Sequence, residues 1–177
     1  MSKIFVQENF FDDKAYQEIV HEMISLDYSP AAKESRESFK ACYWHYRELP
    51  EKCDVKTEIK KLVKKHFNYE IKKFVLPSIY TMVGATDSPK IHKDTNIEGS
   101  VPKYQLIIYM CGPESINNGT GFFEEKEESS SQVSFHPTTH VGFKANRAIF
   151  FSADIFHSPL QWSGNGSFRY SINNFFT

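Results

Sequence analysis

Two histidines and one aspartate are the side chains of this chain best suited to hold a metal ion. His92 and Asp94 are two positions apart, so in an extended segment they point to the same side and can converge on one point. His157, on a later predicted strand, would supply a third ligand. Two imidazoles and one carboxylate on one face of a divalent metal leave its other coordination positions open.

Such an open ligand set is typical of non-haem Fe(II) oxygenases, in which the free positions admit oxygen and a co-substrate. An isolated His-x-Asp pair is weak by itself, because a structural histidine is the default interpretation. Other residues near the pair must therefore support its interpretation as a metal site.

Arg169 and Ser171 share the same spacing on the last predicted strand. An arginine binds a carboxylate through two parallel hydrogen bonds, and a neighbouring serine hydroxyl can donate one more. An interior arginine is costly without an anion beside it. The pair therefore predicts a bound carboxylate ligand, and the alternative is a surface arginine on a C-terminal strand.

The segment between His157 and Arg169 decides whether one ligand can reach both residues. A tight turn at Asn165-Gly166 would place Arg169 opposite Trp162, too far along the strand from His157. A wider loop through Pro159–Gly166 would bring Arg169 alongside His157, and we predict this wider loop.

The elements that must position these residues change character near residue 75. Before it, two apolar stripes at helical spacing predict helices, one opening at Asp12-Asp13 and one closing near Asn68, after a short strand at Ile4–Val6. After it, short apolar runs between turn signals predict strands. The predicted strands are Ser78–Val83, Lys103–Met110, Gly121–Glu124, Val133–Phe135, His140–Phe143, Ala148–Ser152 and Phe168–Phe175.

Together these elements predict a single domain over residues 1–177, with a helical part over about 1–75 and a β core over about 76–177. The expected fold is mainly β, a sandwich or barrel with two or more N-terminal helices packed outside. Turn signals are expected at Asn117-Asn118-Gly119 and Pro137.

The composition narrows the functional classes. With 21 basic and 22 acidic residues, the net charge of −1 disfavours a nucleic-acid partner. One face of the second predicted helix is nevertheless basic, and we interpret it as a solvated surface rather than a docking patch. It comprises Lys56, Lys60, Lys61, Lys64 and Lys65. The N-terminus has no apolar run and the longest run, Leu106–Cys111, is too short for a membrane span, so a cytoplasmic protein is expected.

From residue 78 to 175 the chain resembles the Fe(II)/2-oxoglutarate-dependent dioxygenases, especially the prolyl 4-hydroxylase-like branch. The ordered motifs are Tyr80-x-x-x-Gly84, His92-x-Asp94, Tyr104-Gln-Leu-Ile-Ile-Tyr109-Met, Gly119-Thr-Gly-Phe122, Ala148-Ile-Phe-Phe-Ser-Ala-Asp-Ile-Phe-His157 and Arg169-Tyr-Ser171. The resemblance implies a double-stranded β-helix, a jelly-roll (cupin-like) core with the metal at its mouth. It also implies three cofactors, Fe(II), 2-oxoglutarate and O2, and hydroxylation of an unactivated C–H bond with release of succinate and CO2.

The resemblance also assigns roles to particular residues. It implies that His92, Asp94 and His157 bind iron, and that Arg169, helped by Ser171, holds the distal carboxylate of 2-oxoglutarate. Tyr80 matches a tyrosine that hydrogen-bonds the co-substrate, although a core aromatic is an equal alternative. Gln105 matches a polar residue beside the co-substrate and should point the same way as Ile107 and Tyr109.

The motif departs from the prolyl 4-hydroxylases at one position, since these usually bind the distal carboxylate with lysine. Arg169-x-Ser171 therefore argues against a proline substrate, and a small molecule or an amino-acid or peptidyl side chain is expected. Two alternatives stay open: a non-catalytic metal- or ligand-binding β-barrel protein, and a nucleic-acid-modifying oxygenase that uses the lysine face. Among the other polar residues, Asp154 is interpreted as a turn residue, and His136 and His140 as exposed.

Overall fold

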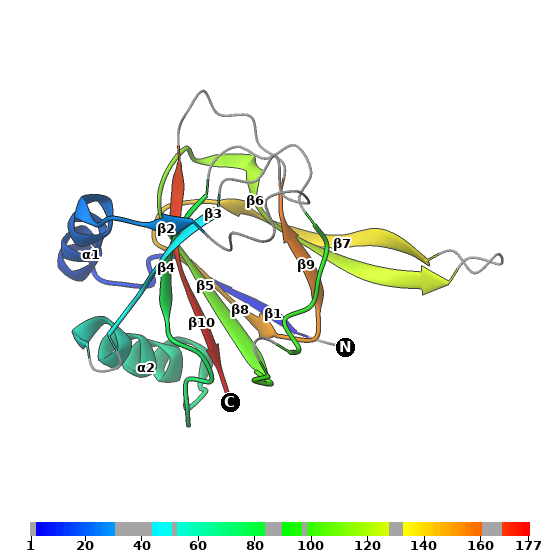
Figure 1. Ribbon diagram of the computed structural model, residues 1–177, viewed down its shortest axis with the longest axis horizontal. Coiled ribbons are helices and arrows are strands. Elements are labelled where there is room, and N and C mark those ends of the chain that lie inside the picture. The colour runs from blue at the N-terminus through cyan, green and yellow to red at the C-terminus, as the bar shows by residue number, and fades with distance from the viewer. Residues whose placement is uncertain are drawn as a thin grey trace.

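The fold is mainly β, with two antiparallel sheets and two helices (Figure 1). The computed structural model describes residues 3–30, 44–50, 53–83, 90–96, 99–127, 133–160 and 168–177. The larger sheet has seven strands, in the order β1 (Ile4–Gln7), β8 (Arg147–Ser152), β5 (Tyr104–Cys111), β10 (Arg169–Phe176), β4 (Ile79–Val83), β3 (Trp44–Glu48) and β2 (Ser29–Pro30). The smaller sheet has three, in the order β7 (Val133–Phe143), β6 (Ser115–Glu127) and β9 (Phe156–Pro159).

The first helix, α1 (Asp13–Ser25), begins where the sequence predicts. The side chain of Asp12 accepts a hydrogen bond of 2.8 Å from the backbone N–H of Ala15, which satisfies one of the free donors of the first turn. Ile19 and Met23, one turn apart, are buried on the inner side of the helix.

The second helix, α2 (Asp54–Phe67), ends at Asn68, which adopts the left-handed conformation that stops helices. Its apolar stripe is buried as expected. Its basic face is solvated in part only: Lys56 is buried, and its ammonium group donates to the carbonyl of Leu49 at 3.4 Å. The prediction of a wholly solvated face is wrong at Lys56, because this side chain points toward Leu49 in the segment that precedes α2.

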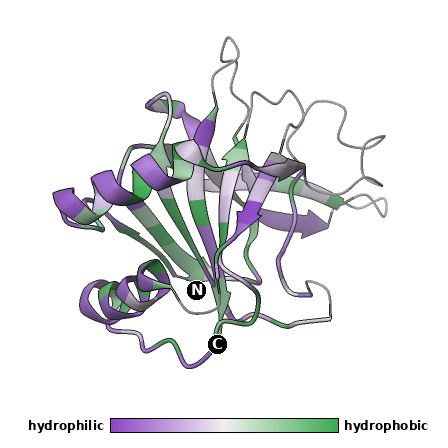
Figure 2. Cartoon of the chain, turned by 60° about the vertical axis from the view of Figure 1, so that its left-hand side comes forward, coloured by the Kyte–Doolittle hydropathy of each residue, from purple (hydrophilic) through white to green (hydrophobic). Residues whose placement is uncertain are grey.

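The main core lies between the helices and one face of the large sheet. Leu106, Ile108 and Met110 of β5 belong to it together with the buried residues of both helices. Figure 2 shows hydrophobic residues gathered in the strands and hydrophilic residues along the helices. Alternate residues of β5, Ile107 and Tyr109, belong to a second cluster on the other face of the sheet.

The smaller sheet differs from the sequence prediction in its strand limits. The two predicted strands 133–135 and 140–143 are one strand, β7, which pairs with β6 past Pro137 through a register shift. The predicted turn at Asn117-Asn118-Gly119 lies inside β6, beside a second register shift. Gly119 has φ 156°, and a Cβ there would meet the carbonyl oxygen of Val141 at 2.0 Å. The turn-type residues therefore mark a bulge and a close backbone approach, not a chain reversal.

Three strands lie in the half of the chain that the periodicity predicts as helical. β1 is expected, whereas β2 and β3 are not. β3 pairs with β4 from Trp44↔Val83 to Glu48↔Ile79 and with β2 on its other side, so it extends the large sheet beyond β4. Its aromatic and charged residues show no clear alternation of apolar and polar positions, and the pairing is non-local. The short β9 is missed as well, because it is only four residues long.

Candidate metal centre

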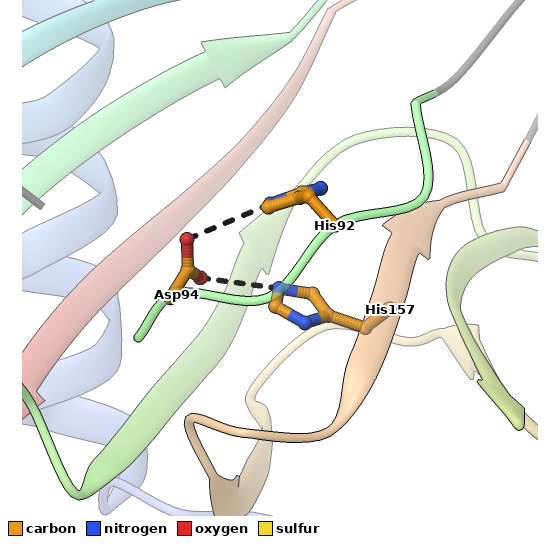
Figure 3. A group of neighbouring side chains, drawn as sticks. All are labelled: His92, Asp94 and His157. Atoms are coloured by element: carbon orange, nitrogen blue, oxygen red, sulfur yellow. Dashed lines mark ion pairs between the residues drawn. The ribbon is translucent and has the colours of Figure 1, made fainter. Parts of the chain in front are cut away.

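His92, Asp94 and His157 converge at one point of the structure (Figure 3). Their ligand atoms all lie within 4.8 Å of one another. Nε2 of His157 lies 3.2 Å from one carboxylate oxygen of Asp94, and Nε2 of His92 lies 3.7 Å from the other. The two imidazoles therefore present the same nitrogen to the shared carboxylate.

Hydrogen bonds on the far side of each ring fix this orientation. Nδ1 of His92 lies 2.9 Å from the carbonyl oxygen of Lys90, and Nδ1 of His157 lies 3.0 Å from that of Ile155. A carbonyl oxygen only accepts, so in each neutral ring the proton is on Nδ1 and the lone pair on Nε2. Backbone carbonyls that hold imidazole rings in this way are typical second partners of metal-binding histidines.

The backbone holds the two histidines opposite each other. His92 and His157 form an isolated antiparallel bridge, with N–H to carbonyl distances of 3.0 and 2.9 Å. The N–H of Asp94 donates to the carbonyl of Ala153 at 3.0 Å. The segment around His92 is thus an extra extended piece laid along β9, which gives His92 and Asp94 the common direction that their spacing predicts.

Apolar rings surround the inner histidine. The ring of His157 makes a T-shaped contact with Phe151 at 5.0 Å and a tilted one with Phe122 at 6.4 Å, and its side chain is 4% exposed. His92 is more open, at 33%. Burial, followed by the nearby His157, lowers the pKa of His92 below its ordinary value. Both effects keep the imidazole neutral, which is the form that binds a metal.

The three residues lie in the wall of a cavity of about 580 Å³, lined from both sheets. This volume is in the usual range for small-molecule sites. Arg169, Ser171 and Gln105 line the same cavity. The other described wall residues are Tyr46, Glu48, Leu76, Pro77, Ile79, Thr81, Val83, Ile107, Tyr109, Thr120, Pro159, Asn173 and Phe175.

Arg169 is buried where β10 faces the smaller sheet, and is 6% exposed. Its Nη1 donates to the side-chain oxygen of Asn118 and, at 3.1 Å, to the carbonyl of Gly119. Both partners lie on β6, so they help to orient the guanidinium group in the wall of the cavity. A planar guanidinium group can bind a carboxylate through two parallel hydrogen bonds.

Hydroxyl groups gather beside Arg169. The hydroxyl of Tyr109 lies 2.7 Å from that of Thr120, and the hydroxyl of Ser171 lies 2.7 Å from that of Thr81. Burial raises the pKa of Tyr109 to about 12, so its phenol stays protonated and can donate a hydrogen bond at neutral pH. The sequence does not identify Tyr109, Thr81 and Thr120 as site residues. The alternation of side chains along a strand, which places Gln105 on this face, places Tyr109 there as well.

Tyr80 lies elsewhere. It is fully buried in the core under the helices, whereas its strand neighbours Ile79, Thr81 and Val83 line the cavity. Adjacent residues of a strand point to opposite faces, so Tyr80 cannot share the face of Thr81. Tyr80 is therefore a core aromatic, and we leave it out of the site.

The path between His157 and Arg169 excludes the tight hairpin. β9 pairs with β6 in the smaller sheet, and β10 pairs with β4 and β5 in the larger one, so the chain crosses between sheets. The two residues are not strand neighbours, but they line one cavity. Most of the predicted loop Pro159–Gly166 lies outside the described residues.

The remaining polar residues lie away from the cavity. Asp154 is an exposed turn residue, and His136 and His140 are exposed on β7, as predicted. Among the described wall residues, Arg169 is the one with a permanent positive charge. The lysines of α2 are on a helix packed against the other face of the large sheet, so they form no basic groove beside the three ligands.

Solved structures resemble this fold along nearly its whole length. A prolyl-4-hydroxylase from Pseudomonas putida matches with a TM-score of 0.60 and 11% identity, over 99% of this chain and 92% of that one. A prolyl hydroxylase from Trichoplax adhaerens, in complex with a hypoxia inducible factor peptide fragment, matches with 0.67 and 10% identity, over 98% and 82%. HygX from Streptomyces hygroscopicus, with nickel, 2-oxoglutarate and hygromycin B bound, matches with 0.66 and 9%, over 99% and 83%.

This chain has the fold of the 2OG-Fe(II) oxygenases. No protein-family model and no curated protein matches its sequence. The jelly-roll fold expected from the resemblance is thus present, and the two histidines and one carboxylate are a donor set that suits Fe(II). Among the described residues, no helix is long and apolar enough to span a membrane.

Proposed function

We propose that this protein is an Fe(II)- and 2-oxoglutarate-dependent oxygenase. The observation that carries the proposal is the convergence of His92, Asp94 and His157 in the wall of a cavity that also contains the buried Arg169. The fold shared with 2OG-Fe(II) oxygenases supports it.

In each of the three residues one atom is available to bind the metal. Nε2 of His92 and of His157 would bind the metal, because their Nδ1 atoms are engaged by backbone carbonyls. Asp94 would supply the carboxylate, which offsets one of the two positive charges. Bound iron would supply the oxidative chemistry, in which O2 is the oxidant: one of its oxygen atoms enters succinate as 2-oxoglutarate loses CO2, and the other hydroxylates a substrate C–H bond.

The chain's own contribution at the other end is to hold the co-substrate. Arg169 would bind the distal carboxylate, and the protonated hydroxyl of Tyr109 and that of Ser171 would donate further bonds. Asn118 and Gly119 orient the guanidinium group before the ligand arrives, so little conformational freedom is lost on binding. Ile107 gives this wall an apolar patch between Gln105 and Tyr109, and Phe122 and Phe151 pack against His157 at the metal end, where they exclude water.

The substrate would be a small molecule or an amino-acid or peptidyl side chain. Both kinds occur among the similar structures, one with a peptide fragment and one with hygromycin B bound. The cavity volume of about 580 Å³ accommodates a co-substrate with a compact group beside it.

Anaerobic titration with Fe(II) and then 2-oxoglutarate tests the proposal. We expect the weak visible charge-transfer band of the iron chelate, lost in His157→Ala and weakened in Arg169→Ala. His136→Ala, an exposed histidine on β7, is the matched control and should keep the band. Iron binding without the band would disprove the role of 2-oxoglutarate. Binding of neither would favour the alternative, a non-catalytic ligand-binding protein.

A further inference from the structure

The cavity continues beyond the part that the co-substrate would fill. Gln105 and Tyr109 lie on the same side of β5, four residues and therefore about 13 Å apart. Gln105 pairs with Phe151, whose ring contacts His157, so Gln105 lies at the level of the metal ligands. Tyr109 is near Arg169. The Gln105 end is thus where a substrate would meet the metal.

Gln105 has an unused acceptor at this end. Its residue is 4% exposed and lines the cavity, yet its Oε1 has no hydrogen-bond partner among the residues that the structure describes. A buried acceptor without a partner is destabilising, because it has lost its hydrogen bond to water. Rotation of the terminal amide brings either its oxygen or its nitrogen toward the cavity. A substrate that donates a hydrogen bond there would satisfy this group.

Glu48 adds a negative charge to the same cavity. It lies at the end of β3, where its side chain is exposed at the edge of the cavity, and its carboxylate forms no ion pair with another described residue. Water solvates this carboxylate in the free protein. A metal dication with the doubly charged 2-oxoglutarate is neutral overall, so binding of the cofactors adds no charge that would offset Glu48.

We propose that Glu48 and Gln105 form a substrate subsite for a cationic compound, an amine or guanidine on an aliphatic stem. The cationic group would lie at Glu48, and a donor near the oxidised carbon would lie at Gln105. β3 and β5 are separated by β4 and β10, and the register places Gln105 two residues along the strands from the level of Glu48, so the two residues are about 16 Å apart. The substrate spans this distance over the apolar side chains of Ile79 and Phe175.

The neighbouring wall fits such a stem. Leu76, Pro77, Ile79 and Phe175 are apolar, and Asn173 is the one amide between the strands of Glu48 and Gln105 in the described wall. The long stems of lysine-like and arginine-like groups cover apolar surface while their charged ends stay with a polar partner. A neutral compound of equal length would leave Glu48 without a partner.

The test compares 8-guanidinooctan-1-ol with 8-ureidooctan-1-ol, which have nearly the same shape, carry a hydroxyl donor for Gln105 at the far end and differ in charge. Each is titrated into the anaerobic Fe(II)–2-oxoglutarate protein and followed through the charge-transfer band and by calorimetry. We expect the guanidinium to bind about two- to fivefold more tightly, because water partly screens an ion pair with an exposed carboxylate. In Glu48→Gln the ratio should fall to about one. Glu70→Gln, an exposed glutamate outside the cavity wall, should keep it.

Three results would overturn the subsite: equal binding of both probes, binding of neither, or a preference that survives in Glu48→Gln. Loss of the band in Glu48→Gln would overturn it too, because that result assigns the residue to the co-substrate. The inference rests on the proposed function, but the two fail separately. Absence of the band in the unmodified protein contradicts the cofactors, whereas a normal band without charge preference contradicts only the substrate class.

Discussion

The two faces of the large sheet are built from alternate residues of the same strands, and they serve different purposes. Leu106 and Ile108 of β5 close a core against the helices, whereas Gln105, Ile107 and Tyr109 line the cavity. On the helix face, burial is mostly apolar and contributes to stability. On the cavity face, the buried hydroxyl and amide groups are hydrogen-bonded to one another, and among the described wall residues Oε1 of Gln105 is the buried polar atom without a partner. Substitutions on the two faces should therefore separate function from stability.

The largest expected effect is on the cavity face. His92→Ala removes a metal ligand, so 2-oxoglutarate turnover should fall by more than about 100-fold. Loss of a residue that only hydrogen-bonds to a metal ligand already lowers metal affinity or activity by about 10–100-fold, and loss of the ligand itself should cost more. His92 is partly exposed, so thermal unfolding of the metal-free protein should change little. Turnover is followed as succinate release. Activity near the unmodified level would remove His92 from the site.

Arg169→Met comes next, and it tests the end of the cavity that holds the distal carboxylate. Removing one partner of a buried charge pair costs about 2–5 kcal/mol, so KM for 2-oxoglutarate should rise by about 100-fold. Arg169→Lys keeps the positive charge but loses the planar group that forms two parallel hydrogen bonds to a carboxylate, so it should give an intermediate KM. An unchanged KM in both variants, with folding verified by circular dichroism, would place the carboxylate elsewhere.

Ile108→Ala is the counterpart on the helix face. Ile108 is fully buried in the core, so its truncation should lower the free energy of unfolding by about 2–5 kcal/mol. Denaturant titration measures this loss. KM for 2-oxoglutarate at a temperature where the variant is folded should stay within about twofold. A large change in KM would show that the two faces are coupled.

Gln105→Leu compares the two faces most closely, because it should raise stability while it removes the hydrogen-bond acceptor that we assign to substrate binding. An apolar side chain of similar size removes the unpartnered acceptor, so the free energy of unfolding should rise by about 1 kcal/mol. Stability that falls instead would show that Gln105 is satisfied in the free protein, and the acceptor would then not be reserved for a ligand.

Tyr80→Phe is the smallest expected effect. Tyr80 lies on the helix face, so KM for 2-oxoglutarate should remain within about twofold and stability should change by less than about 1 kcal/mol. A tenfold rise in KM would return Tyr80 to the co-substrate site.

The sequence predicts the parts of this molecule that follow from local geometry. The spacing of His92 and Asp94 predicts a common direction, and the structure brings both to His157. The alternation along β5 likewise predicts that Gln105, Ile107 and Tyr109 share a face, and they do. α1 begins at the predicted cap Asp12, and α2 ends at Asn68 as predicted.

What the sequence does not predict depends on long-range pairing. Tyr80 was matched to the site by a motif, but a difference of one position along a strand reverses the face. Glu48 could not be found, because β3 reaches the cavity only through its pairing with β4. Asn118 and Gly119 carry turn signals, and the bulge that carries them to Arg169 depends on pairing with β7.

The structure of the anaerobic complex with Mn(II) and 2-oxoglutarate tests the central claim most directly. Mn(II) replaces Fe(II) without turnover, so both ends of the cavity can be observed with the co-substrate in place. We expect the metal on His92, Asp94 and His157, and the distal carboxylate on Arg169, with Gln105 and Glu48 free of the co-substrate. A metal bound elsewhere, or a co-substrate carboxylate at Gln105, would contradict the account.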